Sequence, residues 1–288
     1  MTLFETVKIA LDALYTQCKK RYADKTDRKI KDAISYLSKA YGQLNADGRN
    51  PINYEDPATR FAYVYKYTAT HGDYLVQILE QYRNKHETNV FRSESVKVSC
   101  VGGGPGSDIV AVLKYLDEFK ADEPVRKLTF FLLDKEQAWG DTWSEFDESF
   151  TGDLRMNTSF QPLDVTKPAS YRNQTKFFEA DLFTLSYFIS EVLAFDGDGS
   201  VTGFLTTLFQ NAKSGALFLY DDNGHSSFSE FFDAQWKRAG LKCLHAADRV
   251  SWTPRHSEQA SELGDYLGKF GQAPKLKSEL SYRLLGKK

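Results

Sequence analysis

Apolar strand patterns and amphipathic helix patterns alternate from residue 96 onward, and this alternation constrains the fold more than any other feature of the sequence. Short β-branched and aromatic runs predict strands, and apolar residues at three- and four-residue spacing predict helices. A parallel sheet needs such a helical crossover between its strands. Strands are expected at residues 96–101, 128–133, before 164, at 181–186 and at 216–220, and helices at 109–119, 139–146, 188–192 and 201–210.

The last part of the chain leaves this alternation. A helix at 228–239 is followed by two strand-like segments, 241–252 and 280–285, with a long polar loop between them. Two strands joined in this way favour antiparallel pairing at a sheet edge. We therefore expect a doubly wound, Rossmann-like α/β sheet of mostly parallel strands that ends in an antiparallel terminal strand pair.

No strand pattern precedes residue 96. Residues 3–44 and the segment from Pro57 to Ile78 repeat apolar residues with helical period, and Pro57 suits a first helical turn. The chain has 288 residues, 41% of them hydrophobic, which is enough for one α/β domain with an addition. We expect a helical N-terminal cap at residues 1–93 and the α/β domain at residues 94–288.

Glycines 102, 104 and 106 lie between the first predicted strand and the helix that follows it. Glycine permits left-handed backbone conformations and lets a ligand approach the chain closely, so this bend is a candidate binding site. Dinucleotide-binding folds use the spacing G-x-G-x-x-G, but Ser107 occupies the position of the last glycine here. The observed spacing, G-x-G-x-G, disfavours a pyridine-dinucleotide oxidoreductase.

Acidic residues follow the next two predicted strands. Asp134 ends the second strand, where a carboxylate can accept hydrogen bonds from both hydroxyls of a ribose, or can cap the next helix. Asp164 follows the third strand and could meet an adenine amino group or belong to a turn. Carboxyl ends of parallel strands meet at one edge of the sheet, so we expect both residues near the glycine bend.

These strand-end residues together resemble the cofactor site of the class I S-adenosylmethionine-dependent methyltransferase superfamily, over roughly residues 94–288. The resemblance implies S-adenosylmethionine as cofactor, with its methionine part over the bend, its ribose at Asp134 and its adenine at Asp164. The sequence departs from the superfamily at Cys100, where an acidic residue is common, which leaves Asp108 or a water molecule to hold the cofactor's amino group. The implied cofactor-binding residues are Gly102, Gly103, Gly104, Gly106, Asp108, Asp134, Asp164 and Ser186.

The fourth predicted strand leads into Leu185-Ser-Tyr-Phe-Ile-Ser-Glu191. This stretch resembles that of some ribosomal-RNA methyltransferases, including the fungal 25S rRNA uridine-N3 type, which implies RNA as the methyl acceptor. It lacks the Pro-Pro and Pro-Cys signatures of enzymes that methylate exocyclic amines or cytosine C5. Catalytic candidates are Tyr187, Glu191 and Asp221, although Glu191 could instead favour a helix N-terminus and Asp221 could lie in a solvated turn.

The helical cap offers substrate-binding candidates. Arg60, Tyr63 and His71 could line a pocket for a base or another planar molecule, or Tyr63 could pack the cap against the sheet. His71 has no partner at ligand spacing, and the three cysteines show no paired spacing, so we expect neither a metal site nor disulfides.

The net charge and the N-terminal sequence limit which partners and which cellular compartment we expect. The net charge is −2, which disfavours a globally basic nucleic-acid binder. One local basic segment is either a solvated helix face or an RNA-binding face: Lys19, Lys20, Arg21, Lys25, Arg28, Lys29 and Lys31. A small-molecule acceptor or a non-catalytic binding module remains an alternative. No run suits a membrane span and the N-terminus does not resemble a signal peptide, so a cytoplasmic or nuclear protein is expected.

Overall fold

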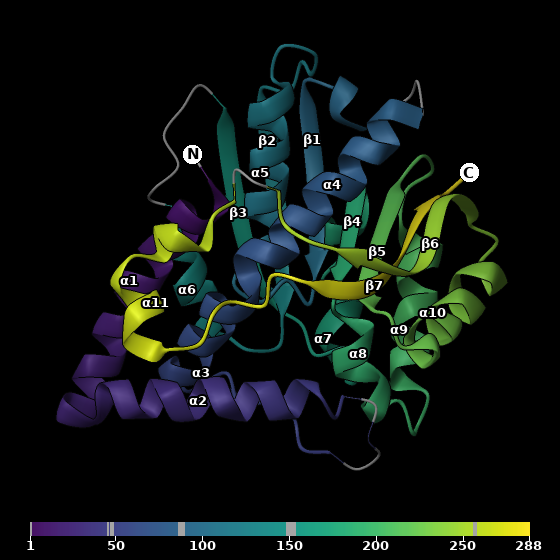
Figure 1. Ribbon diagram of the computed structural model, residues 1–288. Helices are drawn as coiled ribbons and strands as arrows, with labels where there is room; N and C mark the ends of the chain where they lie inside the picture. Colours follow the sequence, from purple (N-terminus) through teal and green to yellow (C-terminus); the bar gives the residue numbers. More distant parts are fainter. Residues whose placement is uncertain (1, 45, 47–48, 86–89, 148–153, 256–257) are drawn as a thin grey trace.

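One mixed sheet forms the centre of the molecule (Figure 1). The computed structural model describes residues 2–44, 46, 49–85, 90–147, 154–255 and 258–288. Within these residues, seven strands lie in the order β3-β2-β1-β4-β5-β7-β6. Their bounds are β1 (Ser95–Val101), β2 (Lys127–Asp134), β3 (Arg155–Pro162), β4 (Leu182–Ser186), β5 (Leu217–Asn223), β6 (Lys242–Trp252) and β7 (Ser278–Gly286).

The first five strands are parallel, and the last two are antiparallel to their neighbours. β1 pairs with β2 on one side and with β4 on the other, so the direction in which the chain adds strands reverses at β1. β7 lies antiparallel between β5 and β6. The predicted doubly wound sheet with its antiparallel terminal pair is confirmed. In such sheets ligands bind beyond the carboxyl ends of the strands at the reversal, here between β1 and β4.

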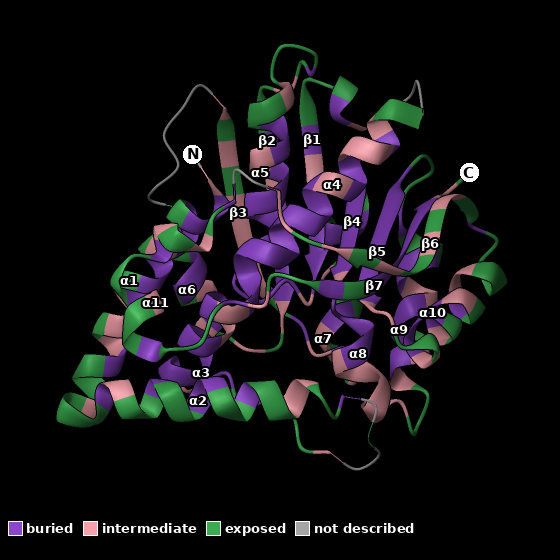
Figure 2. Ribbon diagram, viewed as in Figure 1, coloured by how far each residue is buried: buried purple, intermediate pink, exposed green. Residues whose placement is uncertain are grey.

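Helices cover both faces of the sheet, and the burial colours of Figure 2 show the inner strands enclosed between them. The cap helices, α5 and α6 share one hydrophobic core with one face, and α9 and α10 share a second core with the other. Their bounds are α5 (Ser107–Phe119), α6 (Ala138–Asp147), α7 (Ala169–Arg172), α8 (Ile189–Val192), α9 (Ser200–Asn211), α10 (Ser226–Arg238) and α11 (Asp265–Phe270).

The N-terminal residues are helical, as the periodicity predicts, and several of the helix starts have local causes. The cap comprises α1 (Leu3–Tyr22), α2 (Thr26–Tyr41), α3 (Pro57–Tyr63), a π-helical turn η2 (Val64–Thr68) and α4 (Ala69–Lys85). A capping box of Thr2 and Glu5 begins α1. The Asp56 carboxylate caps α3, and Pro57 occupies its first turn.

The hydrophobic core does not stop at the predicted boundary near residue 94. Leu11 and Ile34 of the cap belong to the same buried cluster as Val98 and Leu132 of the sheet. The cap therefore packs on the sheet as one side of a continuous core. Helix α2 lies beside α3 along the lower margin of the molecule in Figure 1, and its last residue, Tyr41, reaches α8.

Candidate active site

The glycine bend is fixed to the end of β2 by backbone hydrogen bonds. The Gly102 and Gly103 N–H groups both donate to the Leu133 carbonyl, at 2.8 and 3.2 Å. The Gly104 N–H donates to Oδ2 of Asp134 at 3.1 Å. The structure thus brings Asp134 to the bend, as the parallel strand order predicts.

The three glycines of the bend with a positive φ are required for two different reasons. A Cβ added at Gly102 would lie 2.4 Å from the Phe188 ring, and one at Gly106 would lie 2.3 Å from the Trp143 ring. The protein's own aromatic rings therefore require these two glycines. A Cβ at Gly104 would lie 3.9 Å from the Trp139 ring, an ordinary contact distance, so at this residue the positive φ alone favours glycine.

Asp134 accepts hydrogen bonds with both carboxylate oxygens. Besides the bond from Gly104, its Oδ1 accepts from the Glu136 N–H at 2.9 Å. Removal from bulk water raises the pKa of Asp134 to about 7, and the charge of Glu191 adds to the rise. A carboxylate has about four lone-pair sites, so Asp134 keeps capacity for ribose hydroxyl donors.

Asp164 lies after β3 but its side chain is bound within its own turn. Its Oδ1 accepts from the N–H and the hydroxyl of Thr166, and its Oδ2 pairs with Lys167 at 2.8 Å. Although partial burial opposes it, these contacts lower the pKa of Asp164. They are the contacts that the turn interpretation predicts, and adenine binding by Asp164 stays a prediction.

Five aromatic side chains of the cap and α6 form a connected cluster, and one of them, Trp139, lies against the bend at Gly104. Ring centroids lie 5.0 Å apart for Tyr54 and Trp139, 5.6 Å for Tyr63 and Trp139, and 4.8 Å for Tyr41 and Tyr67. We call Tyr41, Tyr54, Tyr63, Tyr67 and Trp139 the aromatic lid. Tyr63 is only half-buried, and burial raises its pKa together with the charges of Glu191, Asp108 and Asp134.

Glu191 fastens the lid to α8. Its Oε1 accepts from the hydroxyls of Tyr41 and Tyr54, the latter at 3.1 Å. Burial raises the pKa of Glu191, while these two hydrogen bonds and the charge of Arg49 oppose the rise. Glu191 is in the first turn of α8, so the predicted helix position is correct, but its side chain bonds the cap.

Tyr187 joins the end of β4 to the cap. Its ring stacks on His71 with centroids 3.6 Å apart and planes 5° from parallel. Its φ is +50°, which is strained for a bulky side chain, and such strain often accompanies function. Burial holds the pKa of Tyr187 far above its usual range and that of His71 far below it, so both rings are neutral.

Two further carboxylates lie beneath the bend, on the cap side of the sheet. Oδ2 of Asp108 accepts from the Thr184 hydroxyl, and Oδ2 of Asp221 accepts from the Ser186 hydroxyl at 3.2 Å. Burial raises the pKa of Asp108 to about 7 and that of Asp221 well above its usual range. Asp221 is fully buried, which differs from the solvated turn that the sequence left open.

Asp222, the neighbour of Asp221, points to the other face of the sheet. Its two oxygens accept from the N–H groups of Ser190 and Asn223, each at 2.8 Å. Burial raises its pKa to about 7. Adjacent strand residues face opposite sides, so the pair supplies one carboxylate to each face.

Arg60 is buried away from these carboxylates. Its guanidinium donates to the Tyr54 and Glu55 carbonyls, at 2.7 and 3.0 Å, and to Gln17 Oε1 at 3.0 Å. These bonds tie the loop before α3 to α1. Of the predicted substrate residues, Tyr63 and His71 lie at the site, whereas the described contacts of Arg60 hold the cap together.

The sequence did not reveal most of the lid. Tyr41 and Tyr54 meet Glu191 across separations of 150 and 137 residues, which no local pattern encodes. Trp139 and Trp143 are four residues apart on α6 and both face the bend, so their helical spacing was the one available signal.

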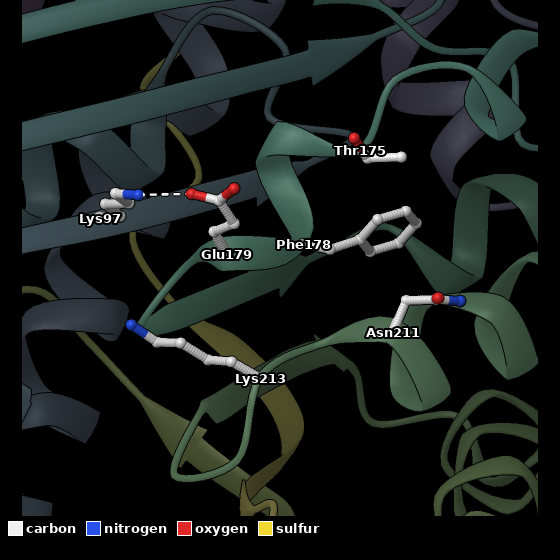
Figure 3. Close-up of a pocket in the computed structure, with 6 residues that line it drawn as sticks. All are labelled: Lys97, Thr175, Phe178, Glu179, Asn211 and Lys213. Atoms are coloured by element: carbon white, nitrogen blue, oxygen red, sulfur yellow. Dashed lines mark hydrogen bonds and ion pairs between the residues drawn. The ribbon is translucent and has the colours of Figure 1, made fainter.

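A cavity of about 440 Å³ lies at the opposite edge of the sheet (Figure 3). Lys97 and Lys213, at the amino ends of β1 and β5, line it. Lys97 pairs with Glu179 at 2.6 Å and Lys213 with Asp181 at 2.5 Å. Both lysine charges are thus balanced, and the cavity lies away from the carboxyl ends of the strands where the candidate site is built.

Among the described residues, no three His, Cys, Asp or Glu side chains are grouped to hold a metal ion. No helix that these residues form combines the length and apolarity of a membrane span. Cys18, Cys100 and Cys243 are free thiols.

No family model matches the sequence, and no curated protein matches it. Some solved structures are similar to it at low identity. An O-methyltransferase family protein from Burkholderia thailandensis is 13% identical, with a TM-score of 0.48 over 90% of this chain and 71% of that one. An N-methyltransferase from Bradyrhizobium japonicum, solved with S-adenosyl-L-homocysteine, is 8% identical, with a TM-score of 0.44 over 86% and 98%.

An arsenic(III) S-adenosylmethionine methyltransferase from Chlamydomonas reinhardtii is 13% identical, with a TM-score of 0.43 over 74% of this chain and 73% of that one. Likenesses of this size identify neither a reaction nor an acceptor for this chain. The function of this chain must therefore be inferred from the residues at the sheet edge.

Proposed function

We propose that this protein is an S-adenosylmethionine-dependent methyltransferase. The observation that carries the proposal is the approach of three features at one sheet edge: the left-handed glycine bend at Gly104, the carboxylate of Asp134 bonded to it, and the buried carboxylates of Asp108 and Asp221 nearby. A sulfonium nucleoside has a ribose for Asp134 and two positive charges for the acidic surroundings. The residues present therefore fit the cofactor.

When bound, the cofactor would supply an electrophilic methyl group whose sulfonium leaves as a neutral thioether. The chain needs to align an acceptor with that group and exclude water, which is largely a matter of position. The aromatic lid and the Tyr187–His71 stack close the site on the side of the cap. Glu191 is the carboxylate best placed to take a proton from an acceptor at the lid, because its Oε1 lies among the lid hydroxyls.

We propose RNA as the acceptor, on the resemblance of residues 185–191 to ribosomal-RNA methyltransferases. The exposure of the basic segment on α1 and α2 supports this, since all seven of its Lys and Arg side chains are exposed. The phosphates of the RNA would then bind the exposed basic segment, while a base enters the site beneath the aromatic lid. The enclosed, acidic site favours a small-molecule acceptor as the second candidate, because buried carboxylates repel phosphate.

The test is calorimetric titration with S-adenosyl-L-homocysteine, followed by methyl transfer from labelled cofactor to separate pools of RNA, protein and metabolites. We expect binding by the wild type and its loss in Asp134→Ala, with Asp117→Ala, on the exposed side of α5, as the matched control. Label in the RNA pool supports the first acceptor, and label in metabolites supports the second. Absence of binding by the wild type would refute the proposed function.

A further inference from the structure

The amino group of the cofactor lacks the acidic partner that the superfamily commonly provides at the end of β1. Cys100 occupies that position and is fully buried. Burial also raises the pKa of its thiol well above the usual range, so Cys100 supplies no charge. If the proposed function is correct, another group must bind the ammonium.

Asp108 and Asp221 lie on the same side of the sheet as Cys100. Asp108 is 3% exposed and Asp221 is 0% exposed. The strand register brings them together: Thr184, which donates to Asp108, is the partner of Cys100, and Ser186, two residues along β4 on the same face, is the partner of Asp221. Each carboxylate has one hydroxyl donor, from Thr184 and Ser186 respectively, and each therefore keeps capacity to accept further hydrogen bonds.

One buried oxygen of this cluster, Asp221 Oδ1, has no hydrogen-bond partner among the described residues. No described Lys, Arg or His forms an ion pair with Asp108 or Asp221 either. A buried carboxylate without a cation or a full set of hydrogen bonds is costly, so the cluster is incomplete in the protein alone. A primary ammonium, with three N–H donors and one positive charge, supplies what is missing.

We propose that Asp221, together with Asp108, binds the α-ammonium group of the cofactor and replaces the acidic residue that Cys100 has displaced. Asp221 is then a binding residue for the cofactor and not a general base for the acceptor. This rests on the proposed function and deepens it. The cluster lies beside the glycine bend, because Asp108 is in the first turn of the helix that the bend opens.

The test compares two ligands that differ in the amino group alone: S-adenosyl-L-homocysteine and its deamino analogue. Calorimetry on the wild type, Asp221→Asn and Asp108→Asn is expected to show a loss of about tenfold to a hundredfold in affinity for the amino ligand in each variant. Affinity for the deamino analogue should stay at the wild-type value. Asp222→Asn is the matched control, the same change one residue along on the opposite face, and should treat both ligands alike.

The outcomes separate this inference from the proposed function. If the wild type binds neither ligand, the proposed function fails. If it binds both equally, or if Asp221→Asn and Asp108→Asn weaken both by the same factor, the ammonium assignment is wrong while the proposed function stands. Should Asp221→Asn not fold, Asp108→Asn and the wild-type comparison of the two ligands still decide the point.

Discussion

Replacing Gly104 and Gly106 separately by alanine should show that Gly104 mainly serves ligand binding, whereas Gly106 mainly serves the stability of the fold. Both residues have positive φ, +49° and +91°, where an alanine costs about 1–2 kcal/mol. At Gly104 the added Cβ meets nothing closer than 3.9 Å. We therefore expect Gly104→Ala to lower the free energy of unfolding by about 1–2 kcal/mol and no more.

At Gly106 the same change adds a steric cost. The new Cβ would lie 2.3 Å from Cε3 and 2.8 Å from Cζ3 of Trp143, a ring that is 4% exposed and cannot move freely. Overpacking of this kind costs about 1–3 kcal/mol beyond the backbone strain, so Gly106→Ala should lose about 2–5 kcal/mol. Urea unfolding with unchanged m-values measures both losses.

The loss of affinity for the cofactor, in contrast, should come mainly from the change at Gly104. If the methionine part of the cofactor passes over the backbone of Gly104, an added Cβ would obstruct it, and Gly104→Ala should weaken calorimetric binding of S-adenosyl-L-homocysteine while remaining the more stable variant. Wild-type affinity in Gly104→Ala would refute the placement of the cofactor over this residue. Equal stability of the two variants would refute the packing argument at Gly106.

Two further predictions concern the buried carboxylates. The pKa values of Asp108 and Asp222 are raised to about 7 from a usual value near 4, so the folded state binds their protons more tightly than the unfolded state does. This stabilisation is complete below pH 4 and is lost toward pH 7, at about 1.4 kcal/mol per pH unit and group. The melting temperature should therefore fall between pH 5 and 7, and Asp222→Asn should flatten the fall; a rising profile contradicts this. At the lid, Glu191→Ala should cost about 1–3 kcal/mol because Tyr41 and Tyr54 lose their acceptor, whereas Glu191→Gln keeps an oxygen there and should stay near wild-type stability. Loss of methyl transfer in Glu191→Gln with unchanged cofactor affinity would identify Glu191 as the base, and full activity would exclude it.

The strands could be predicted because the inner strands of a parallel sheet are buried on both faces. The apolar runs at 128–133 and 216–220 correspond to β2 and β5, and the predicted segment 280–285 corresponds to β7. β3 gave a weaker signal because it is an edge strand, and residues such as Arg155 and Asn157 remain partly or fully exposed. The strength of each strand pattern therefore depends on how far the strand is buried and not on β-propensity alone.

The residues of the candidate site that follow strand ends could be predicted from the sequence. The residues that reach the site because helices pack against it could not. Asp134 meets the bend because parallel strands end at one edge, which the strand order alone requires. The glycines were only partly explained, since the sequence gives no sign that Phe188 and Trp143 pack against Gly102 and Gly106. Helical periodicity predicts which face of a helix is buried, but not what that face meets.

The distribution of charge restricts how an RNA acceptor could bind. The carboxylates are inside, whereas the basic segment is on the outer surface of α1 and α2. From Lys31 to Tyr41, α2 spans about 15 Å at 1.5 Å per residue, so phosphates held by the segment stay outside the lid. A phosphate would be repelled by whichever of Asp134, Glu191 and Asp221 is ionised, whereas a neutral or cationic group would not. We therefore expect the accepting atom to belong to a base or an amine whose phosphate stays outside.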